Sequence, residues 1–300
     1  MDFRPLINLC ESTNTKYLIN GKTAPLTSIR VGNTAKLIVF PTEMHVFCQI
    51  IDNILTNNYK YVILGNGTNS YFCDVYDGVV VVTNGIDTVL VSGNDMIATC
   101  GASLKNCANN ALCHSLAGLE FAYGIPGTIG GALYMNAEAF GSTIGQFVVK
   151  SVVYDTLTRQ ISELSSNESH LFGKKCSIFS AKRYILLETT LRLTPSTFDF
   201  VKNKTCELLK KRNSSQPLDM PSAGSAFKRN GNYYVSKLID EAGLKGFRIG
   251  GAEVSKKHAG FIVNSSGATA NDINKLIEYI KHKIYDKYQI NLIEEIIYIE

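Results

Sequence analysis

A glycine-rich run at residues 119–141, LEFAYGIPGTIGGALYMNAEAFG, constrains the fold of this chain more than any other stretch. Glycine is used where the backbone takes a positive φ or where another group comes very close, and Pro126 stiffens the first turn. The run between Phe121 and Phe140 is apolar and, apart from Glu138, uncharged. Such a loop presents bare backbone N–H groups, which can bind a pyrophosphate. The alternative interpretation is a buried turn between two core strands.

The length and composition are typical of a globular protein with room for two domains. The chain has 300 residues, is 45% hydrophobic and 19% charged, and carries a net charge of +4. Its Lys/Arg clusters are short, at 210–212 and 256–257. Such short clusters indicate solvent-exposed faces and do not indicate a nucleic-acid-binding surface. The net positive charge is still compatible with a mildly basic site for an anionic ligand.

The cysteines and histidines show no metal-ligand spacing. None of the eight cysteines forms a CxxC pair, and the five histidines are scattered. There is no cationic-then-apolar leader and no apolar run of transmembrane length. We therefore expect a cytoplasmic protein with reduced thiols, small core cysteines, no metal and no membrane insertion.

A second glycine motif follows a predicted βαβ unit. Residues 35–40 and 61–64 have the composition of strands, and the stretch from 41 or 42 to 57 has the apolar spacing of a helix. Gly65–Asn69, GNGTN, comes directly after the second strand. A strand running into this motif is a candidate phosphate cradle, but no helix follows, so the dinucleotide fingerprint is absent. A plain turn is the alternative.

The remaining pattern predicts an α+β chain. Further short strands are expected at 78–82, 88–100 (with a turn at 93–94), 148–154 and 185–193, and helices at 103–117, 196–212, 233–242 and from 269 onward. The stretch 221–228, PSAGSAFK, is expected to be a small-residue loop that offers Ser225 as a proton donor and Lys228 as a cation. A turn hydroxyl is the alternative for Ser225. The last eleven residues are expected to form a strand in which only one of Glu294 and Glu295 can face a site. The alternative is that both are solvated carboxylates on an edge strand.

Five motifs together resemble the UDP-N-acetylenolpyruvoylglucosamine reductase (MurB, UDP-N-acetylmuramate dehydrogenase) family in its shorter form. They are GNGTN, the glycine-rich run, SIRVGNTA at 28–35, PSAGSAFK at 221–228, and SKLIDEAGLKGFRIGGAEVSKKHAGFIVN at 236–264. The resemblance implies an α+β fold: a two-subdomain FAD-binding domain of the PCMH or vanillyl-alcohol-oxidase-like type, followed by an α+β substrate-binding domain. The implied domains span 1–195, with subdomains of about 1–82 and 83–195, and 196–300.

The resemblance also implies an activity and a cofactor. Members of the family use NADPH and FAD to convert UDP-N-acetylglucosamine-enolpyruvate to UDP-N-acetylmuramate in peptidoglycan synthesis. The residues that the resemblance assigns to FAD are Arg30, Gly65, Asn66, Gly67, Thr68, Asn69, Pro126, Gly127, Thr128, Gly130, Gly131 and Glu138.

By the same resemblance Ser225 is the acid that protonates the substrate carbon, and Glu295, not Glu294, stabilises the enol-type dianion. Asn136 and Lys228 are expected to contact the substrate. Lys175 takes the place of a family arginine.

This sequence departs from the family pattern at five positions. Besides Lys175, Lys174 replaces a tyrosine and Glu138 replaces a glycine near the flavin. Asn33 replaces another glycine, and Thr68 replaces a serine but keeps the hydroxyl. Lysine keeps the charge of arginine but loses its bidentate fork. Two alternatives therefore stay open: a FAD- or nucleotide-sugar-binding paralogue with reduced or lost activity, and another FAD oxidoreductase on this fold. The sequence does not indicate an oligomeric state.

Overall fold

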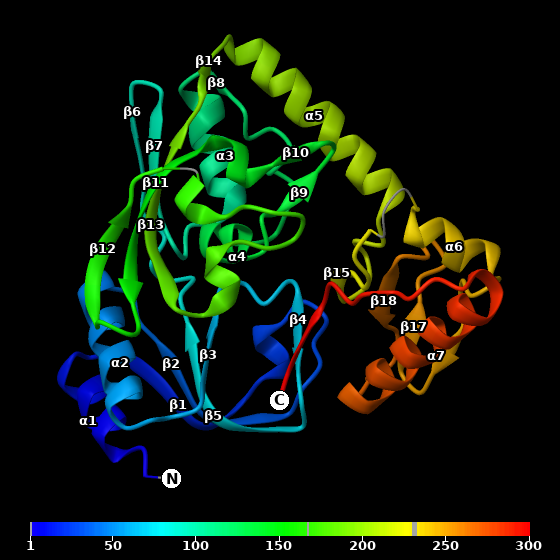
Figure 1. Cartoon of the computed structure of the whole chain (residues 1–300), viewed down its shortest axis with the longest axis horizontal. Coiled ribbons are helices and arrows are strands. Elements are labelled where there is room, and N and C mark those ends of the chain that lie inside the picture. Colours follow the sequence, from blue (N-terminus) through cyan, green and yellow to red (C-terminus); the bar gives the residue numbers. More distant parts are fainter. Residues whose placement is uncertain (1, 167, 230–232) are drawn as a thin grey trace. The chain divides into compact units, whose positions relative to one another are not determined.

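The computed structural model describes residues 2–166, 168–229 and 233–300 (Figure 1). The chain divides into two units, each assembled from separate stretches of sequence. Unit 1 comprises Met1–Leu18, Leu37–Asn66 and Val79–Arg212, and unit 2 comprises Ile19–Lys36, Gly67–Gly78 and Asn213–Glu300. The domain boundary predicted near residue 195 stays a prediction.

A four-stranded sheet has the strand order β1-β2-β5-β3. The bounds of its strands are β1 (Lys16–Lys22), β2 (Thr34–Phe40), β5 (Val75–Val82) and β3 (Tyr61–Leu64). Helix α2 (Met44–Thr56) follows β2 and buries the apolar face that its spacing predicts. The helix begins later than predicted, because Glu43 at its N-cap is still extended. The predicted βαβ unit is also modified, since β5 lies between β2 and β3 and pairs in parallel with β3.

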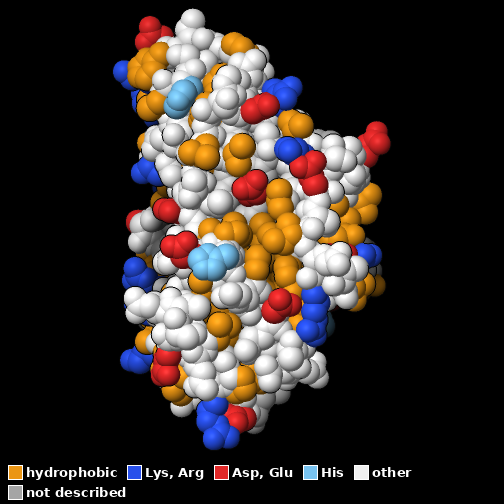
Figure 2. All heavy atoms as spheres, turned by 90° about the vertical axis from the view of Figure 1, so that its left-hand side faces the viewer, with side chains coloured by type: hydrophobic (Ala, Val, Ile, Leu, Met, Phe, Trp, Pro, Cys, Tyr) orange, Lys and Arg blue, Asp and Glu red, His pale blue; other side chains and the backbone are white. Residues whose placement is uncertain are grey.

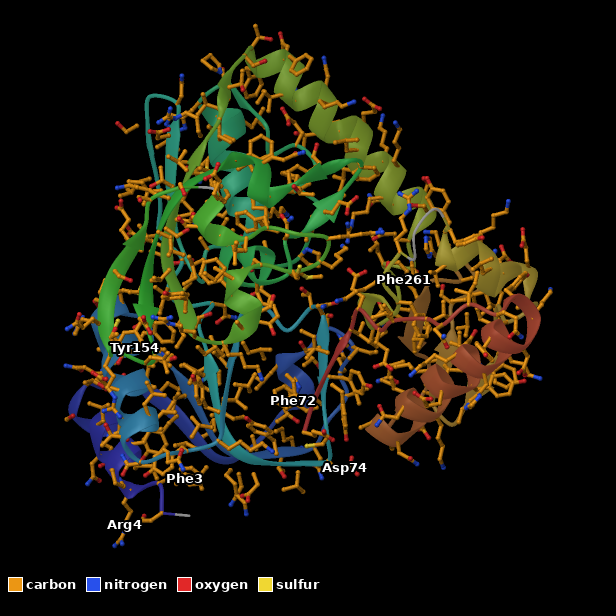
Figure 3. The ribbon with its side chains drawn as sticks, viewed as in Figure 1. Phe3, Arg4, Phe72, Asp74, Tyr154 and Phe261 are labelled. Atoms are coloured by element: carbon orange, nitrogen blue, oxygen red, sulfur yellow. The ribbon has the colours of Figure 1, made fainter. Side chains whose placement is uncertain are left out.

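An antiparallel five-stranded sheet lies wholly in unit 1, in the order β12-β11-β13-β7-β6. Its strands are β12 (Gln160–Leu164), β11 (Val148–Asp155), β13 (Tyr184–Arg192), β7 (Asp95–Thr99) and β6 (Val89–Ser92). Tyr154 on β11, labelled in Figure 3, donates from its hydroxyl to the carboxylate of Asp52 on α2. This hydrogen bond links the five-stranded sheet to the helix that follows β2.

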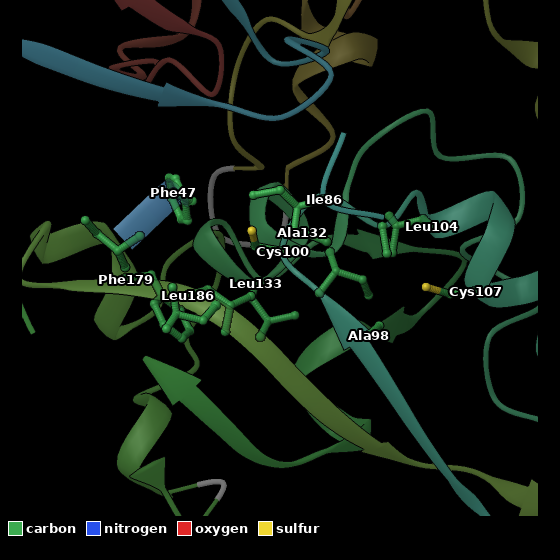
Figure 4. Close-up of a cluster of buried hydrophobic side chains, with 14 of the residues drawn as sticks. Phe47, Ile86, Ala98, Cys100, Leu104, Cys107, Ala132, Leu133, Phe179 and Leu186 are labelled. Carbon is green, nitrogen blue, oxygen red and sulfur yellow. The ribbon is translucent and has the colours of Figure 1, made fainter. Parts of the chain in front are cut away.

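Helices α3 (Leu104–Cys113) and α4 (Ile129–Tyr134) pack against the five-stranded sheet. Figure 4 shows Ala132 and Leu133 of α4 among buried side chains from β7, β13 and α3. Helix α4 lies inside the glycine-rich run, which the sequence analysis took for a loop. The apolar residues that separate the glycines are what α4 buries, so the run is part of the core.

Unit 2 contains a four-stranded sheet in the order β15-β18-β17-β16 and two helices. The bounds are β15 (Ser222–Ser225), β18 (Phe261–Asn264), β17 (Ala252–Val254), β16 (Arg248–Ile249), α6 (Val235–Glu241) and α7 (Ala270–Tyr288). Helix α7 buries Ile273, Leu276, Ile277, Ile280 and Ile284, as its periodicity predicts. A short parallel pair, β19 (Ile297–Ile299) with β4 (Ser70–Phe72), joins the end of the chain to the stretch after GNGTN.

The other elements are short or peripheral. They are α1 (Arg4–Ser12), α5 (Phe198–Ser215), the pairs β8 (Leu116–Ala117) with β14 (Thr194–Pro195) and β9 (Glu138–Ala139) with β10 (Ser142–Thr143), and the 3-10 turns η1 (Ala24–Leu26), η2 (Ile144–Phe147), η3 (Glu168–His170) and η4 (Ile178–Ala181).

Three further sequence predictions about elements are wrong. The helix expected over 103–117 ends at Cys113, because Ser115 takes a φ of 55° and Leu116–Ala117 pairs with β14. PSAGSAFK is not only a loop, since Ser222–Ser225 forms β15. The final strand is only Ile297–Ile299, so Glu294 and Glu295 precede it.

The surface in Figure 2 mixes residue types. Hydrophobic side chains gather toward the middle of this face, with acidic and basic side chains at their border. Within the described residues, no helix combines the length and apolar character that crossing a membrane requires.

The N-terminus of α7 generates a pH prediction. Thr269 and Asp272 form a capping box, and backbone N–H groups of Thr269 and Gly251 donate to Asp272. These hydrogen bonds, with that from Thr269 first, lower the pKa of the Asp272 carboxyl. The ionised carboxylate therefore stabilises the folded state above the pKa of the unfolded chain, and this stability is lost as the pH falls through the lower folded pKa.

We expect Asp272→Asn to lower the free energy of unfolding by about 0.5 kcal/mol at pH 7, a small value because the carboxyl is exposed. Urea denaturation of both proteins at several pH values measures the difference, which should shrink below about pH 4. A difference that stays constant down to pH 2 would contradict this cause.

Candidate active site

In unit 1, residues 65–66 of GNGTN lie beside the glycine-rich run. The side-chain amide of Asn66 donates to the carbonyl oxygen of Pro126 over 2.8 Å. A Cβ atom built on Gly65 would lie 2.2 Å from Thr128 Oγ1, so only glycine allows this approach. GNGTN follows β3, and the glycine-rich run enters α4 through Thr128, so two separate elements position one pair of loops.

This pair of loops presents unused backbone donors. Within the described part of the chain, the N–H groups of Gly65, Asn66, Gly127 and Thr128 donate to no protein acceptor. Thr128 is 1% exposed, so water does not cover it freely. A buried backbone N–H without an acceptor costs about 1–3 kcal/mol. The donors therefore fit an anionic group such as a pyrophosphate.

Two other residues that the resemblance assigns to FAD already use their N–H groups within the protein. The N–H of Gly130 donates to Cys100 O at 2.8 Å, and that of Gly131 donates to Thr128 Oγ1 at 3.3 Å. These two bonds fix the first turn of α4, which directly follows Gly127 and Thr128. Glu138 lies exposed on β9, so its carboxylate can be solvated. The assignment of these three residues to the cofactor stays a prediction.

A tight turn at Gly173–Cys176 carries Lys174 and Lys175 in unit 1. The N–H of Gly173 donates to Cys176 O at 3.0 Å, and Lys175 takes a φ of 58°. Asn136, which is 7% exposed, donates from its amide to Gly173 O at 2.9 Å and accepts from Gly145 N at 3.0 Å. Asn136 therefore supports the turn that holds Lys175, and its expected contact with substrate stays a prediction.

In unit 2 the 28–33 segment is held against the 67–69 part of GNGTN. Ser28 N donates to Gly67 O at 3.1 Å, and Ser28 Oγ donates to Ser222 O at 2.6 Å. Gly67 has a φ of 58°, and a Cβ there would lie 2.1 Å from Leu26 O. Asn264 Nδ2 donates to Ile29 O at 3.1 Å.

These bonds bring together four stretches that are distant in sequence, at residues 28–29, 67, 222 and 264. Arg30, which follows Ile29, is exposed with a φ of 58°.

The expected catalytic residues of unit 2 lie on adjacent segments. Ser225 ends β15 and pairs with Phe261 on β18. The N–H of Glu295 donates to Ala226 O at 2.9 Å, and the N–H of Lys228 donates to Ile293 O at 2.8 Å. The structure therefore places Ser225, Lys228 and Glu295 within one small region of unit 2.

The two neighbouring glutamates are both half-buried. Glu294 accepts from Lys281 Nζ at 3.2 Å, an ion pair between partly exposed groups. The N–H of Glu295 donates to Ala226 O, next to Ser225. The choice of Glu295 as the site carboxyl stays a prediction.

Comparison with known proteins now decides the family. The profile described as "UDP-N-acetylenolpyruvoylglucosamine reductase, C-terminal domain" matches residues 216–299, and the profile of an FAD binding domain matches residues 35–157. A UDP-N-acetylenolpyruvoylglucosamine reductase of Caldanaerobacter subterraneus is 41% identical over 282 residues, which is 94% of this chain and 93% of the relative. The chain belongs to the UDP-N-acetylenolpyruvoylglucosamine reductase family.

Further relatives agree with this assignment. A UDP-N-acetylenolpyruvoylglucosamine reductase of Clostridium botulinum is 41% identical over 287 residues, covering 94% of this chain and 92% of the relative. The crystal structure of the reductase from Thermus caldophilus superposes with a TM-score of 0.80 at 24% identity, covering 95% of this chain and 99% of that one. The reductase fold and the predicted α+β class are thereby confirmed.

Some supporting residues escaped the sequence analysis. Ser177 and Ser180 both donate from their hydroxyls to Tyr134 O, at 3.0 and 2.9 Å. They attach η4 to the end of α4, and with it the turn at Gly173–Cys176, called here the lysine turn. Neither contact could be predicted from the sequence, because Tyr134 lies more than 40 residues away along the chain.

The cysteine prediction is partly right. Cys10, Cys100 and Cys107 are buried core residues, whereas Cys113, Cys176 and Cys206 are exposed. Burial raises the pKa of the Cys100 thiol to about 12, so this thiol is unreactive.

The contact at Gly65 generates a prediction about flavin retention. Gly65→Ala adds a Cβ that forces Thr128 away and separates the two loops. We expect the purified variant to fold but to retain at most about one tenth of the parent's flavin, since losing one hydrogen bond to a charged group costs about 1.5–3 kcal/mol. The ratio of flavin to protein absorbance measures this.

Gly93→Asn is the matched control for Gly65→Ala. Gly93 occupies the β6–β7 turn with a φ of 57° and open space around it, and asparagine tolerates this φ. Its flavin content should equal that of the parent. Parent-like flavin content in Gly65→Ala would show that the loops do not hold the cofactor.

Proposed function

We propose that this chain is an NADPH-dependent UDP-N-acetylenolpyruvoylglucosamine reductase, which reduces UDP-N-acetylglucosamine-enolpyruvate to UDP-N-acetylmuramate. The observation that carries the proposal is the 41% identity to curated reductases over 94% of the chain. The chain is thus an FAD-dependent oxidoreductase of peptidoglycan synthesis, and its substrates are a UDP-sugar and NADPH. We place the reaction in the cytoplasm, where both substrates are made.

The cofactor fits the donors of unit 1. Gly65, Asn66, Gly127 and Thr128 would hold the pyrophosphate of FAD with backbone N–H groups that have no protein acceptor. In unit 2, the exposed Arg30 and the half-buried Thr68 would add a charge and a hydroxyl. The chemistry that FAD supplies is hydride transfer from NADPH to the methylene carbon of the enolpyruvyl group.

Ser225 is proposed as the acid for the neighbouring carbon. After hydride addition this carbon carries carbanion character, delocalised onto the carboxylate, and needs a proton. The hydroxyl of Ser225 can donate that proton, and the pairing of β15 with β18 fixes its backbone. The flanking Gly224, with a φ of 76°, bends the strand at this point.

Glu295 and Lys175 are proposed to stabilise the dianion. Two negative charges develop on the substrate carboxylate, and fixed donors aimed at them lower the barrier. Glu295 would form a hydrogen bond with the substrate carboxylate, and Lys175 would supply a positive charge. Lys228 is proposed to bind the substrate on the same segment as Ser225, and Asn136 is proposed to contact it as well as support the lysine turn.

The structure offers no reason to prefer an inactive paralogue. Two departures from the family pattern had suggested an inactive paralogue. The first is Glu138, which lies exposed on β9 and so needs no buried partner. The second is Lys175, and the turn that carries it is held by Asn136 and Ser177. We also propose the division into an FAD-binding domain over residues 1–195 and a substrate-binding domain over 196–300.

The proposed function is tested with purified protein, NADPH and UDP-N-acetylglucosamine-enolpyruvate. We expect NADPH oxidation that depends on the sugar nucleotide and yields UDP-N-acetylmuramate by mass spectrometry. Ser225→Ala should slow this turnover while the flavin is still reduced by NADPH. Oxidation of NADPH at one rate with and without the sugar nucleotide would overturn the proposal.

The lysine turn generates a matched pair of variants. Lys175→Ala should slow the half-reaction with substrate by about 10- to 100-fold, because a hydrogen bond to a charged group contributes about 1.5–3 kcal/mol. Lys174→Ala removes the same charge from the neighbouring, exposed position and should stay within about 2-fold of the parent.

Single-turnover return of oxidised flavin absorbance measures this half-reaction. Lys175→Arg should be at least as fast as the parent, since it restores the fork. If Lys175→Ala matches Lys174→Ala, Lys175 has no part in the reaction.

A further inference from the structure

The backbone of Glu295 is fixed from both sides in unit 2. Its N–H donates to Ala226 O at 2.9 Å, next to Ser225, and its C=O accepts from Asn69 Nδ2 at 2.9 Å. The donor Asn69 belongs to GNGTN, a loop that the sequence analysis assigned wholly to the cofactor. Its side-chain amide instead points to the main chain of the proposed catalytic glutamate.

A second hydrogen bond strengthens this connection. Ile297 N donates to Asn69 O at 2.9 Å, so the main chain and the side chain of Asn69 bracket residues 295–297. Directly beyond, β19 pairs in parallel with β4. Asn69 therefore begins the contact by which the end of the chain is attached to unit 2.

The strand that follows Glu295 is short. β19 has only three residues, so its pairing with β4 provides few ladder hydrogen bonds. Tyr71 on β4 adds an anchor, since its ring stacks on that of Tyr298 at 5.1 Å and its hydroxyl donates to Asn274 Oδ1 at 2.5 Å.

We propose that Asn69 is a positioning residue for Glu295. The amide fixes the peptide unit that follows the glutamate, and so the direction in which the carboxyl leaves the backbone. Placement matters because an error of about 1 Å in a catalytic group can cost about 100-fold in rate. This inference rests on the proposed function, because it concerns the reaction in which Glu295 takes part.

The proposal separates two ways in which Asn69 could affect turnover. A residue that only binds cofactor changes flavin retention and both half-reactions. A residue that positions Glu295 changes the half-reaction with substrate alone, and only while Glu295 can act. If Asn69 positions Glu295, a substitution of Asn69 should cause no further loss of rate in a variant whose Glu295 has already been replaced.

The test is a double-mutant cycle with Asn69→Ala and Glu295→Gln in the flavin-loaded enzyme. We expect Asn69→Ala to slow the substrate half-reaction by about 10- to 100-fold, with the NADPH half-reaction and the KM for the sugar nucleotide within about 2-fold of the parent. In the Glu295→Gln background, the further loss should be less than 2-fold. The control Asn110→Asp removes a similar 2.9 Å amide-to-carbonyl bond on α3 and should change neither half-reaction.

Amide hydrogen exchange gives a readout that does not depend on turnover. In Asn69→Ala the amides of Glu295 and Ile297 should exchange faster, while that of Lys228, bonded to Ile293 O, should stay protected. Loss of protection at Lys228 as well would identify general unfolding of the region and overturn the positioning role.

The other outcomes are also decisive. Equal losses from Asn69→Ala in both backgrounds, or a loss that disappears when the rate is expressed per bound flavin, would overturn the positioning role and leave the reductase assignment intact. A parent enzyme without turnover of the sugar nucleotide would overturn the proposed function, and the positioning role with it.

Discussion

The buried backbone N–H of Thr128, with its three unpaired neighbours, is the constraint on which the account of this protein depends. Protein interiors rarely leave such donors unsatisfied, because each costs about 1–3 kcal/mol. Gly65 has no side chain because Thr128 lies where its Cβ would be, and α4 packs into the core directly behind. The buried donor of Thr128 and the donors of the half-buried Gly65, Asn66 and Gly127 are suited to an anionic ligand.

Unit 2 reaches its arrangement by hydrogen bonds between stretches far apart in the sequence. Ser28 binds Ser222, Asn69 binds Glu295, and Asn264 binds Ile29. In each pair a short polar side chain contacts a main-chain carbonyl, so the bond fixes backbone position without depending on the partner's side chain. Together with the backbone bonds from Glu295 N to Ala226 O and from Lys228 N to Ile293 O, these bonds hold the 225–228 segment and Glu295 in one region of unit 2.

Much of the fold could be predicted from the sequence, and the exceptions have physical causes. The apolar spacing of α7 and the residue composition of β3 and β11 are properties of neighbouring residues, so the sequence predicts these elements. They form as expected. The end of α3 and the insertion of β5 depend on pairing with distant strands, which local pattern does not encode. For the site, motifs identified Gly65 and Gly67, but the contacts of Asn136 and Asn69 are visible only in three dimensions.

The central claim, that the loops at 65–66 and 127–128 hold a pyrophosphate, is tested most directly by comparing flavins. Calorimetric titration of the flavin-free protein with FAD and with riboflavin measures what the part of FAD beyond the isoalloxazine and ribityl groups contributes, and Gly65→Ala isolates the loops. We predict that the parent binds FAD at least about 100-fold more tightly than riboflavin, and that most of this advantage disappears in Gly65→Ala. Equal affinities in the parent, or an advantage that survives unchanged in the variant, would contradict the account.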